Sequence, residues 1–112
     1  MGERCISKEC LNDTGFSYTL SLINGKYKMT VLYILMEFGT VRFNEMKKYI
    51  GTISYKTLSS TLKELEADKL VNRKEYPQIP PKVEYSLTDR GKSLIPILDG
   101  MCEWGDKNRI ID

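Results

Sequence analysis

The sequence predicts an α+β fold that is mainly helical, with one β-hairpin placed before a last helix. Three observations support this prediction. Apolar residues recur at helical spacing in four successive segments between residues 16 and 70. The segment VNRKEY, which can form a strand, and the alternating segment VEYSL then flank the proline-rich stretch PQIPPK, which is typical of two strands joined by a stiff loop. Helical spacing returns after Thr88 and continues almost to the end of the chain.

Length and composition suit one small domain. The chain has 112 residues, enough for a single modest core. We expect residues 1–15 to be a flexible N-terminal segment and residues 16–112 to form the domain. No apolar run approaches ~18 residues, so neither a membrane span nor a membrane partner is expected. The N-terminus lacks the apolar core of a secretion signal, which predicts a cytoplasmic protein.

The residue types argue against catalysis. The chain has no histidine, which removes the commonest metal ligand and the commonest general base. Its three cysteines, Cys5, Cys10 and Cys102, form no Cys-x-x-Cys pair, and their odd number favours reduced thiols. No glycine-rich phosphate loop is present. We therefore expect no enzyme activity, no bound metal and no cofactor.

The first two helices differ in how much of their surface is apolar. The segment FSYTLSLI places Phe16, Leu20 and Ile23 on one face and stops at Asn24-Gly25. The segment KYKMTVLYILMEFG is apolar around most of its circumference, which indicates a buried helix that ends at Gly39.

The next two segments form a pair of helices joined by a short bridge. VRFNEMKKYIG is short and stops at its glycine, and ISYKTLSSTLKELEADKL follows. In the second segment Leu58, Leu62 and Leu65 form the inward stripe, and Ser54 is well placed as the N-cap. A short helix followed by a longer one with a polar outer face indicates a helix-turn-helix.

The hairpin and the last helix complete the fold. In VEYSL, Val83, Tyr85 and Leu87 are expected to point inward. Thr88 is expected to cap one final helix, and Pro96 to kink it. The apolar surface of this helix exceeds what one small domain needs. A helix-turn-helix followed by a hairpin is the winged-helix arrangement.

Charge is concentrated in the middle of the chain. Residues 41–82 hold nine Lys and Arg against five Asp and Glu, whereas the whole chain has a net charge of +2. A basic middle region favours a polyanion as partner, although a solvated face would have the same composition.

Several stretches resemble the HxlR family of bacterial winged helix-turn-helix regulators, relatives of the wider MarR group. They are YTLSLINGKYK, VRFNEMKKYIGTIS, LKELEADKLVNRKEYPQIPPKVEYSLTDRGKSLIPIL and MCEWG, and together they span roughly residues 18–105. The resemblance implies a homodimer on a short, roughly palindromic operator, with the second helix of the motif in the major groove. It also implies that the first and last helices form the dimer interface, through Phe16, Leu20, Ile23, Leu94, Leu98, Met101 and Trp104.

Candidate DNA contacts lie on three parts of the winged helix. Short hydroxyls and lysines can reach base edges or phosphates, and a helix N-terminus favours phosphate. At most one of Arg73 and Lys74 can face DNA, because they alternate along a strand. The candidates are Ser54, Tyr55, Lys56, Thr57, Ser60, Thr61 and Lys63 on the outer face of the second helix, Arg42 and Asn44 at the start of the first, and Gln78 and Lys82 in the wing. For each of them a solvated surface position, or a cap for Asn44, is the alternative.

The cysteines depart from the family pattern. Many HxlR proteins carry a cysteine four residues before the tyrosine of the YTL stretch, and in several it senses electrophiles or oxidants. This chain has Thr14 there, so the thiol candidate is Cys10, with Cys5 as a further possibility and an idle thiol as the alternative. Cys102 aligns with a cysteine often seen in the family's last helix, where a small buried hydrophobe is expected.

Three functional hypotheses follow. The first is a DNA-binding transcriptional regulator that acts as a homodimer, as a repressor, with a response to thiol oxidation. The second is a protein-interaction module that keeps the winged-helix shape without binding DNA. The third, a thiol enzyme, has no histidine to activate a cysteine. The sequence specifies neither the operator nor the effector.

Overall fold

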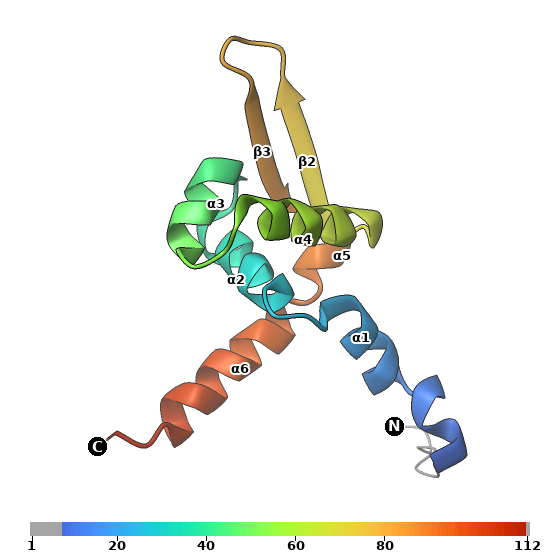
Figure 1. Ribbon diagram of the computed structural model, residues 1–112. Helices are drawn as coiled ribbons and strands as arrows, with labels where there is room; N and C mark the ends of the chain where they lie inside the picture. Colours follow the sequence, from blue (N-terminus) through green and yellow to red (C-terminus); the bar gives the residue numbers. More distant parts are fainter. Residues whose placement is uncertain (1–7, 112) are drawn as a thin grey trace.

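The computed structural model describes residues 8–111 of the chain, with side chains from Cys10 onward. It contains a small three-stranded sheet surrounded by helices, with a hairpin projecting from one end (Figure 1). After a 3-10 helix at Lys8–Asp13, the elements are α1 (Gly15–Ile23), α2 (Lys28–Phe38), β1 (Val41–Arg42), α3 (Phe43–Ile50), α4 (Tyr55–Ala67), β2 (Val71–Tyr76), β3 (Lys82–Leu87), α5 (Asp89–Lys92) and α6 (Ile95–Asn108).

Helix α2 lies at the centre, as its apolar circumference predicts. Val31, Leu32 and Leu35 are buried in one cluster with residues of α3, α4 and the sheet. The helix ends where Gly39 adopts a φ of 79°, a conformation that glycine reaches without steric cost. This central helix supports both the helix-turn-helix and the base of the wing.

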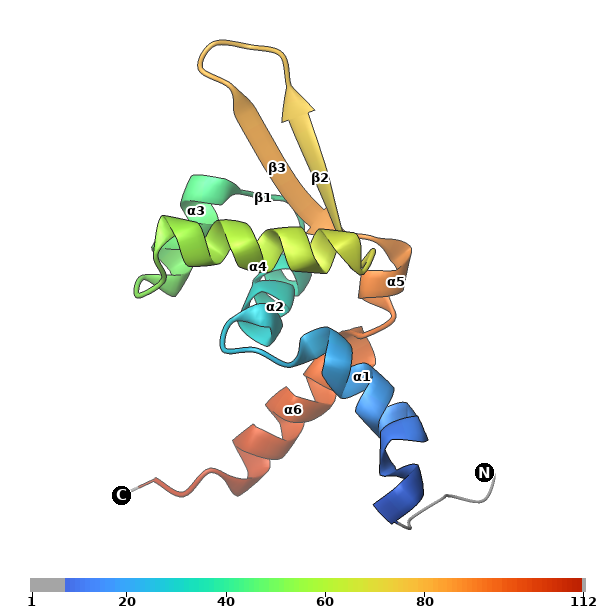
Figure 2. The same ribbon diagram turned by 45° about the vertical axis from the view of Figure 1, so that its right-hand side comes forward.

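The hairpin strands match the expected segments closely. β2 and β3 pair antiparallel from Val71 opposite Leu87 to Tyr76 opposite Lys82. Tyr85 and Leu87 are buried, as the alternation predicts, and Val83 is half-buried. The far end of the hairpin extends well beyond the helices and forms the wing (Figures 1 and 2).

A third strand was not expected. β1 pairs with β3 through Val41 opposite Tyr85 and Arg42 opposite Glu84, so the strand order is β1-β3-β2 (Figure 2). The sequence reading began a helix at residue 41, whereas the helix begins at Phe43. Two residues are too few to produce an alternating pattern, so only the pairing with β3 identifies this strand.

The single kinked C-terminal helix predicted after Thr88 is wrong. Thr88 caps α5, accepting a hydrogen bond from the Gly91 amide at 2.9 Å. This helix ends at Lys92, and a separate helix, α6, begins at Ile95. Pro96 therefore lies in the first turn of a new helix, where its missing N–H would have had no intrahelical partner. In α5, Gly91 approaches the Leu70 carbonyl so closely that a Cβ would overlap it.

The two terminal helices leave the body in different directions. α1 and α6 extend away from the side opposite the wing (Figure 1). The radius of gyration is 16.5 Å, compared with about 13 Å for a compact domain near this size. Residues 8–13 form a 3-10 helix in place of the irregular conformation expected for residues 1–15, of which residues 1–7 lie outside the described range. The flexibility of that segment stays a prediction.

Candidate DNA-binding surface

Helices α3 and α4 form the expected helix-turn-helix. The backbone N–H of Arg42 donates to Glu45 Oε1 at 3.0 Å at the start of α3, and Gly51 ends that helix with a φ of 79°. Ser54 caps α4 as predicted, since its Oγ accepts from the Thr57 amide at 3.1 Å. The turn and the cap fix the angle at which α4 leaves the body.

One predicted contact residue of α4 is wrong. Thr61 is buried, with 7% of its surface exposed, because it lies on the same helical face as Leu58 and Leu65. A hydroxyl residue suits a groove-facing surface, but its position relative to the leucines places it against the core. Thr61 is therefore part of the packing of α4.

The outer face of α4 carries two lysines and a serine. Lys56, Ser60 and Lys63 are exposed, and their spacing puts them on the side opposite the buried leucines. Among the side chains described, those of residues 10–111, no carboxylate oxygen lies within 4.0 Å of either ammonium group. Within that range the two lysines therefore have no ion pair that a phosphate would have to displace.

The first turn of α4 is held by aromatic contacts. The Tyr55 ring is exposed but stacks near Phe43 of α3, with centroids 6.0 Å apart, and the Lys47 ammonium lies 4.7 Å from its centroid. Thr57 is exposed, and its hydroxyl accepts from Ser54 at 3.0 Å. Tyr55 thus presents a positioned ring at the tip of α4.

The start of α3 and the tip of the wing face each other across a depression. Arg42, Asn44 and Lys82 line a cavity of about 580 Å³ together with Pro80 and Pro81. Arg42 and Asn44 are exposed, and so is Gln78 in the wing loop. The structure thus brings residues from both ends of the predicted surface to one place.

The wing lysine is engaged within its own hairpin. Lys82 Nζ lies 3.2 Å from Glu84 Oε2 and 4.7 Å from the centroid of the Tyr76 ring. Tyr76 Oη donates to Glu84 Oε1 at 3.0 Å. This hydrogen bond, followed by the neighbouring Lys82, lowers the pKa of Glu84 below its ordinary value of 4.5. Lys82 stiffens the wing, and a contact with DNA would have to compete with Glu84.

The sequence did not decide which of Arg73 and Lys74 lies on the same side of the hairpin as α4. Arg73 lies opposite Tyr85 in the hairpin register and lines a cavity of about 440 Å³ between the hairpin and α4, whereas Lys74 lies opposite Glu84. Alternation alone shows that the two point to opposite faces, and the burial of Tyr85 is the signal that identifies Arg73 as the residue facing α4.

The residues predicted for the dimer interface divide into two groups. Phe16, Leu20, Met101 and Trp104 are exposed on α1 and α6. Leu98 is 5% exposed and belongs to the core of its own chain, while Ile23 and Leu94 are half-buried and pack against that core. The part of these three residues in a dimer interface stays a prediction. On α6 the apolar residues that pack against the core and those that face outward alternate along the chain, and the sequence pattern does not distinguish the two sets.

The cysteines lie away from α4. Cys10 is half-buried in the 3-10 helix and is disulfide-bonded, so the prediction of reduced thiols is wrong for this residue. Thr14, at the position of the family's cysteine, caps α1 by accepting from the Ser17 amide at 3.0 Å. Cys102 is a free thiol and only half-buried, which differs from the buried hydrophobe expected.

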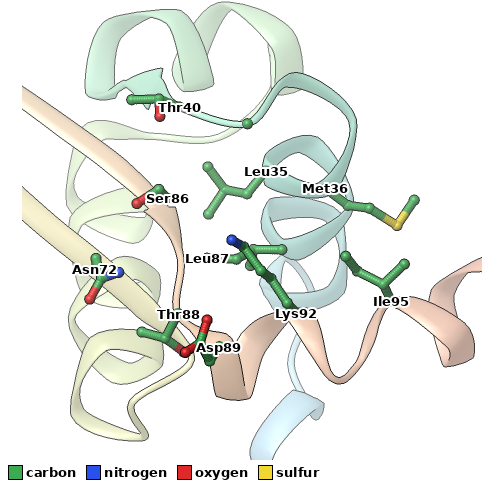
Figure 3. A pocket seen from close by; sticks show the side chains of 11 residues that line it. Leu35, Met36, Thr40, Asn72, Ser86, Leu87, Thr88, Asp89, Lys92 and Ile95 are labelled. Carbon is green, nitrogen blue, oxygen red and sulfur yellow. The ribbon is translucent and has the colours of Figure 1, made fainter.

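A cavity of about 660 Å³ lies away from the candidate DNA-binding surface, where the C-terminal end of α2, the base of the hairpin, α5 and the start of α6 meet (Figure 3). Lys92 and Asp89 are the charged residues that line it, and no residue of α4 does so. In the part of the chain that is described, no cluster of His, Cys, Asp or Glu could hold a metal ion. Within the same residues no helix is both long and apolar enough to cross a bilayer.

A capped, cationic second helix in a helix-turn-helix, flanked by a stiff hairpin, defines the chain as a winged helix-turn-helix protein. Comparison with known proteins agrees. Residues 22–110 match the HxlR-like helix-turn-helix family model. The HTH-type transcriptional regulator BH0655 of Halalkalibacterium halodurans is 66% identical over 99 residues, which are 88% of each chain. The chain therefore belongs to the HxlR-like helix-turn-helix family.

Solved structures of similar proteins extend the comparison. The redox regulator HypR in its oxidised form is 44% identical, with a TM-score of 0.80, over 88% of this chain and 100% of that chain. The reduced form of the transcriptional regulator YodB from Bacillus subtilis is 33% identical, with a TM-score of 0.72, over 86% of this chain and 94% of that chain. Both structures support the winged helix-turn-helix architecture.

Proposed function

We propose that the protein binds duplex DNA as a homodimer and regulates transcription from a short palindromic operator as a cytoplasmic repressor. Its α4 enters the major groove and its wing reaches the adjacent minor groove. The observation that supports this most directly is the outer face of α4, where Lys56 and Lys63 are exposed without any carboxylate partner among the described residues.

The homodimer is supported by the apolar surfaces of the two terminal helices. Phe16 is 71% exposed on α1, and Met101 and Trp104 are 54% and 69% exposed on α6. Exposed aromatic and apolar residues of this number on helices that project from the body are typical of an interface. A second copy of this chain would bury both helices and place two α4 helices about 34 Å apart, one turn of DNA.

The test of DNA binding is a mobility shift at low salt. A duplex selected from a randomised pool is titrated with the wild-type protein and with Lys56→Ala, and the oligomeric state is measured by light scattering. We expect a dimer, and a wild-type affinity that falls steeply with salt because it rests on phosphate contacts. A monomer that ignores every duplex, even at low salt, would instead support a protein-interaction module.

A thiol response is proposed as the regulatory signal. The similarity to a protein described as a redox regulator supports it, and so does the position of Cys10 just before α1. Because Cys10 is disulfide-bonded in this structure, the starting state is the wild type reduced with dithiothreitol. We expect the reduced protein to lose DNA affinity when diamide restores the disulfide, whereas Cys10→Ser no longer responds. A Cys10→Ser protein that responds as the wild type does would transfer the role to Cys5 or Cys102.

A further inference from the structure

The crevice between α4 and the hairpin combines groups that bind phosphate. It is a cavity of about 440 Å³ lined by Ser59, Lys63 and Glu66 of α4, by Arg73 of β2, and by side chains of Phe43 and β3. A hydroxyl, an ammonium and a guanidinium therefore lie around one small space. Arg73 comes from a strand and Lys63 from a helix, so only the folded chain brings the two cations together.

Arg73 is positioned beside the crevice by the register of the hairpin. It lies directly opposite Tyr85 across the hairpin, and Tyr85 is buried. Tyr85 raises the pKa of the Arg73 guanidinium above its ordinary value, and Glu75 contributes in the same direction. A planar guanidinium that lines the crevice offers donor groups in the fork geometry that matches two oxygens of a phosphate.

The existing partner of Arg73 is exchangeable. Arg73 Nη2 lies 3.2 Å from Glu75 Oε1, but the two side chains are 39% and 57% exposed. An ion pair this open to water contributes little, so a phosphate can take the place of Glu75 at small cost. Lys63, across the crevice, has no carboxylate within 4.0 Å among the residues described, even though Glu66 lines the same cavity.

The position of the crevice relative to a duplex identifies the phosphate. If α4 occupies the major groove and the wing the adjacent minor groove, one sugar-phosphate strand separates the two grooves. That strand passes over the surface between α4 and the hairpin, where this cavity lies. Resting on the DNA-binding function proposed above, we infer that Arg73, with Lys63 and Ser59, holds one backbone phosphate of this strand and so fixes the register of the wing against α4.

Lys74 provides a matched control. It is the next residue of the same strand and carries the same charge, but it lies opposite Glu84 on the other face, with its ammonium 5.0 Å from the Tyr76 ring centroid. Arg73→Gln and Lys74→Gln therefore remove the same charge from nearly the same place. Only the first removes a group from the crevice.

The first measurement is the salt dependence of binding to a selected duplex. Each lost phosphate contact lowers the slope of log affinity against log salt by about 0.9, so one contact per subunit gives about 1.8 for a dimer. We expect Arg73→Gln to show this reduction together with an affinity loss of about tenfold. Lys74→Gln should change the slope by less than half as much. Equal effects of the two substitutions would overturn the inference.

The second measurement locates the phosphate. Single neutral methylphosphonates are placed along each strand of the duplex, and each substituted duplex is titrated with wild type, Arg73→Gln and Lys74→Gln. We expect one position per half-site at which neutralisation weakens the wild type and Lys74→Gln but not Arg73→Gln. The inference fails if every position affects Arg73→Gln as it affects the wild type. By contrast, a wild-type protein that binds no duplex would refute the proposed function itself.

A third variant guards against a folding artefact. Glu75→Gln keeps Arg73 and removes its competing carboxylate, so DNA affinity should rise. The comparison is Glu37→Gln, which removes the same charge from an exposed position on α2, away from α4 and the hairpin. A larger increase in DNA affinity for Glu75→Gln than for the comparison variant supports the phosphate site, because misfolding cannot increase affinity. Equal increases in affinity would show that only net charge matters and would count against the phosphate site.

Discussion

The cations of α4 and those of the outer face of the wing carry the same charge in different circumstances. Lys56 and Lys63 have no carboxylate partner among the described residues, and they project from a helix that is rigid because its opposite face is core. Lys74 and Lys82 both lie over the Tyr76 ring, and Lys82 is also paired with Glu84. The difference supports the proposal that Lys56 and Lys63 bind DNA, whereas Lys74 and Lys82 mainly hold the shape of the wing. A count of charges therefore overstates how many are available to DNA.

The largest effect is expected from removing the support shared by both regions. A Cβ at Gly91 would overlap the Leu70 carbonyl, which lies just before β2. We expect Gly91→Ala to lower the free energy of unfolding by about 2–3 kcal/mol, because backbone must move to admit the methyl group. Thermal and urea unfolding measure this. Gly100→Ala in α6 is the control, since open space surrounds that position and its stability should stay equal or rise.

The next effect separates the two groups of lysines directly. Replacing Lys56 and Lys63 together by alanine should lower DNA affinity about 100-fold in a dimer, since four phosphate contacts are lost at roughly 0.7 kcal/mol each. Replacing Lys74 and Lys82 together should lower DNA affinity by less than about 20-fold, because these ammonium groups already have partners. Titrations at one fixed salt concentration provide the comparison. Similar losses in the two double variants would mean that the wing lysines bind DNA as α4 does.

A smaller effect tests whether the wing depends on its internal network. Tyr76→Phe removes the hydroxyl that donates to Glu84, so the pKa of Glu84 should rise towards its ordinary value. Because the folded-state pKa is lowered, the support that Glu84 gives the hairpin is present above pH 4.5 and is lost as the pH falls through the lowered pKa. NMR titration of the Glu84 carboxyl and amide exchange in the wing measure both effects. An unchanged pKa of Glu84 in Tyr76→Phe would show that the neighbouring cations Lys82 and Arg42 set it.

The smallest effect distinguishes two hydroxyl residues that adjoin on α4. Thr61 is buried and Ser60 is exposed. Thr61→Val should leave DNA affinity within about twofold, whereas Ser60→Ala should lower it about threefold through one weak hydrogen bond in each subunit. A loss of affinity confined to Thr61→Val, with stability unchanged, would return Thr61 to the DNA-facing surface.

Sequence reasoning succeeded where a single segment carries its own signal. The stripe of leucines located α4, Ser54 and Thr88 were correct as caps, and alternation located β3. It failed where an element depends on a partner that is distant in the sequence. β1 is two residues long and exists through pairing with β3. The C-terminal helix divides before Ile95 because residues 88–91 pack against the end of α4 and the start of β2. The hydrogen bond from Thr88 Oγ1 to the Lys69 carbonyl at 2.6 Å shows this contact.

The sequence by itself determined the succession of four helices, a hairpin and a further helical segment, together with the basic middle region and the polar face of α4, since periodicity and capping are local properties of the chain. Only the tertiary structure decided which cations are free and which are held, because that depends on the contacts between separate elements. Hairpin register places Lys82 beside Glu84 and turns Arg73 towards α4, across from Lys63. Those partners are fixed by packing around α2, and packing between elements leaves no periodic trace in the sequence.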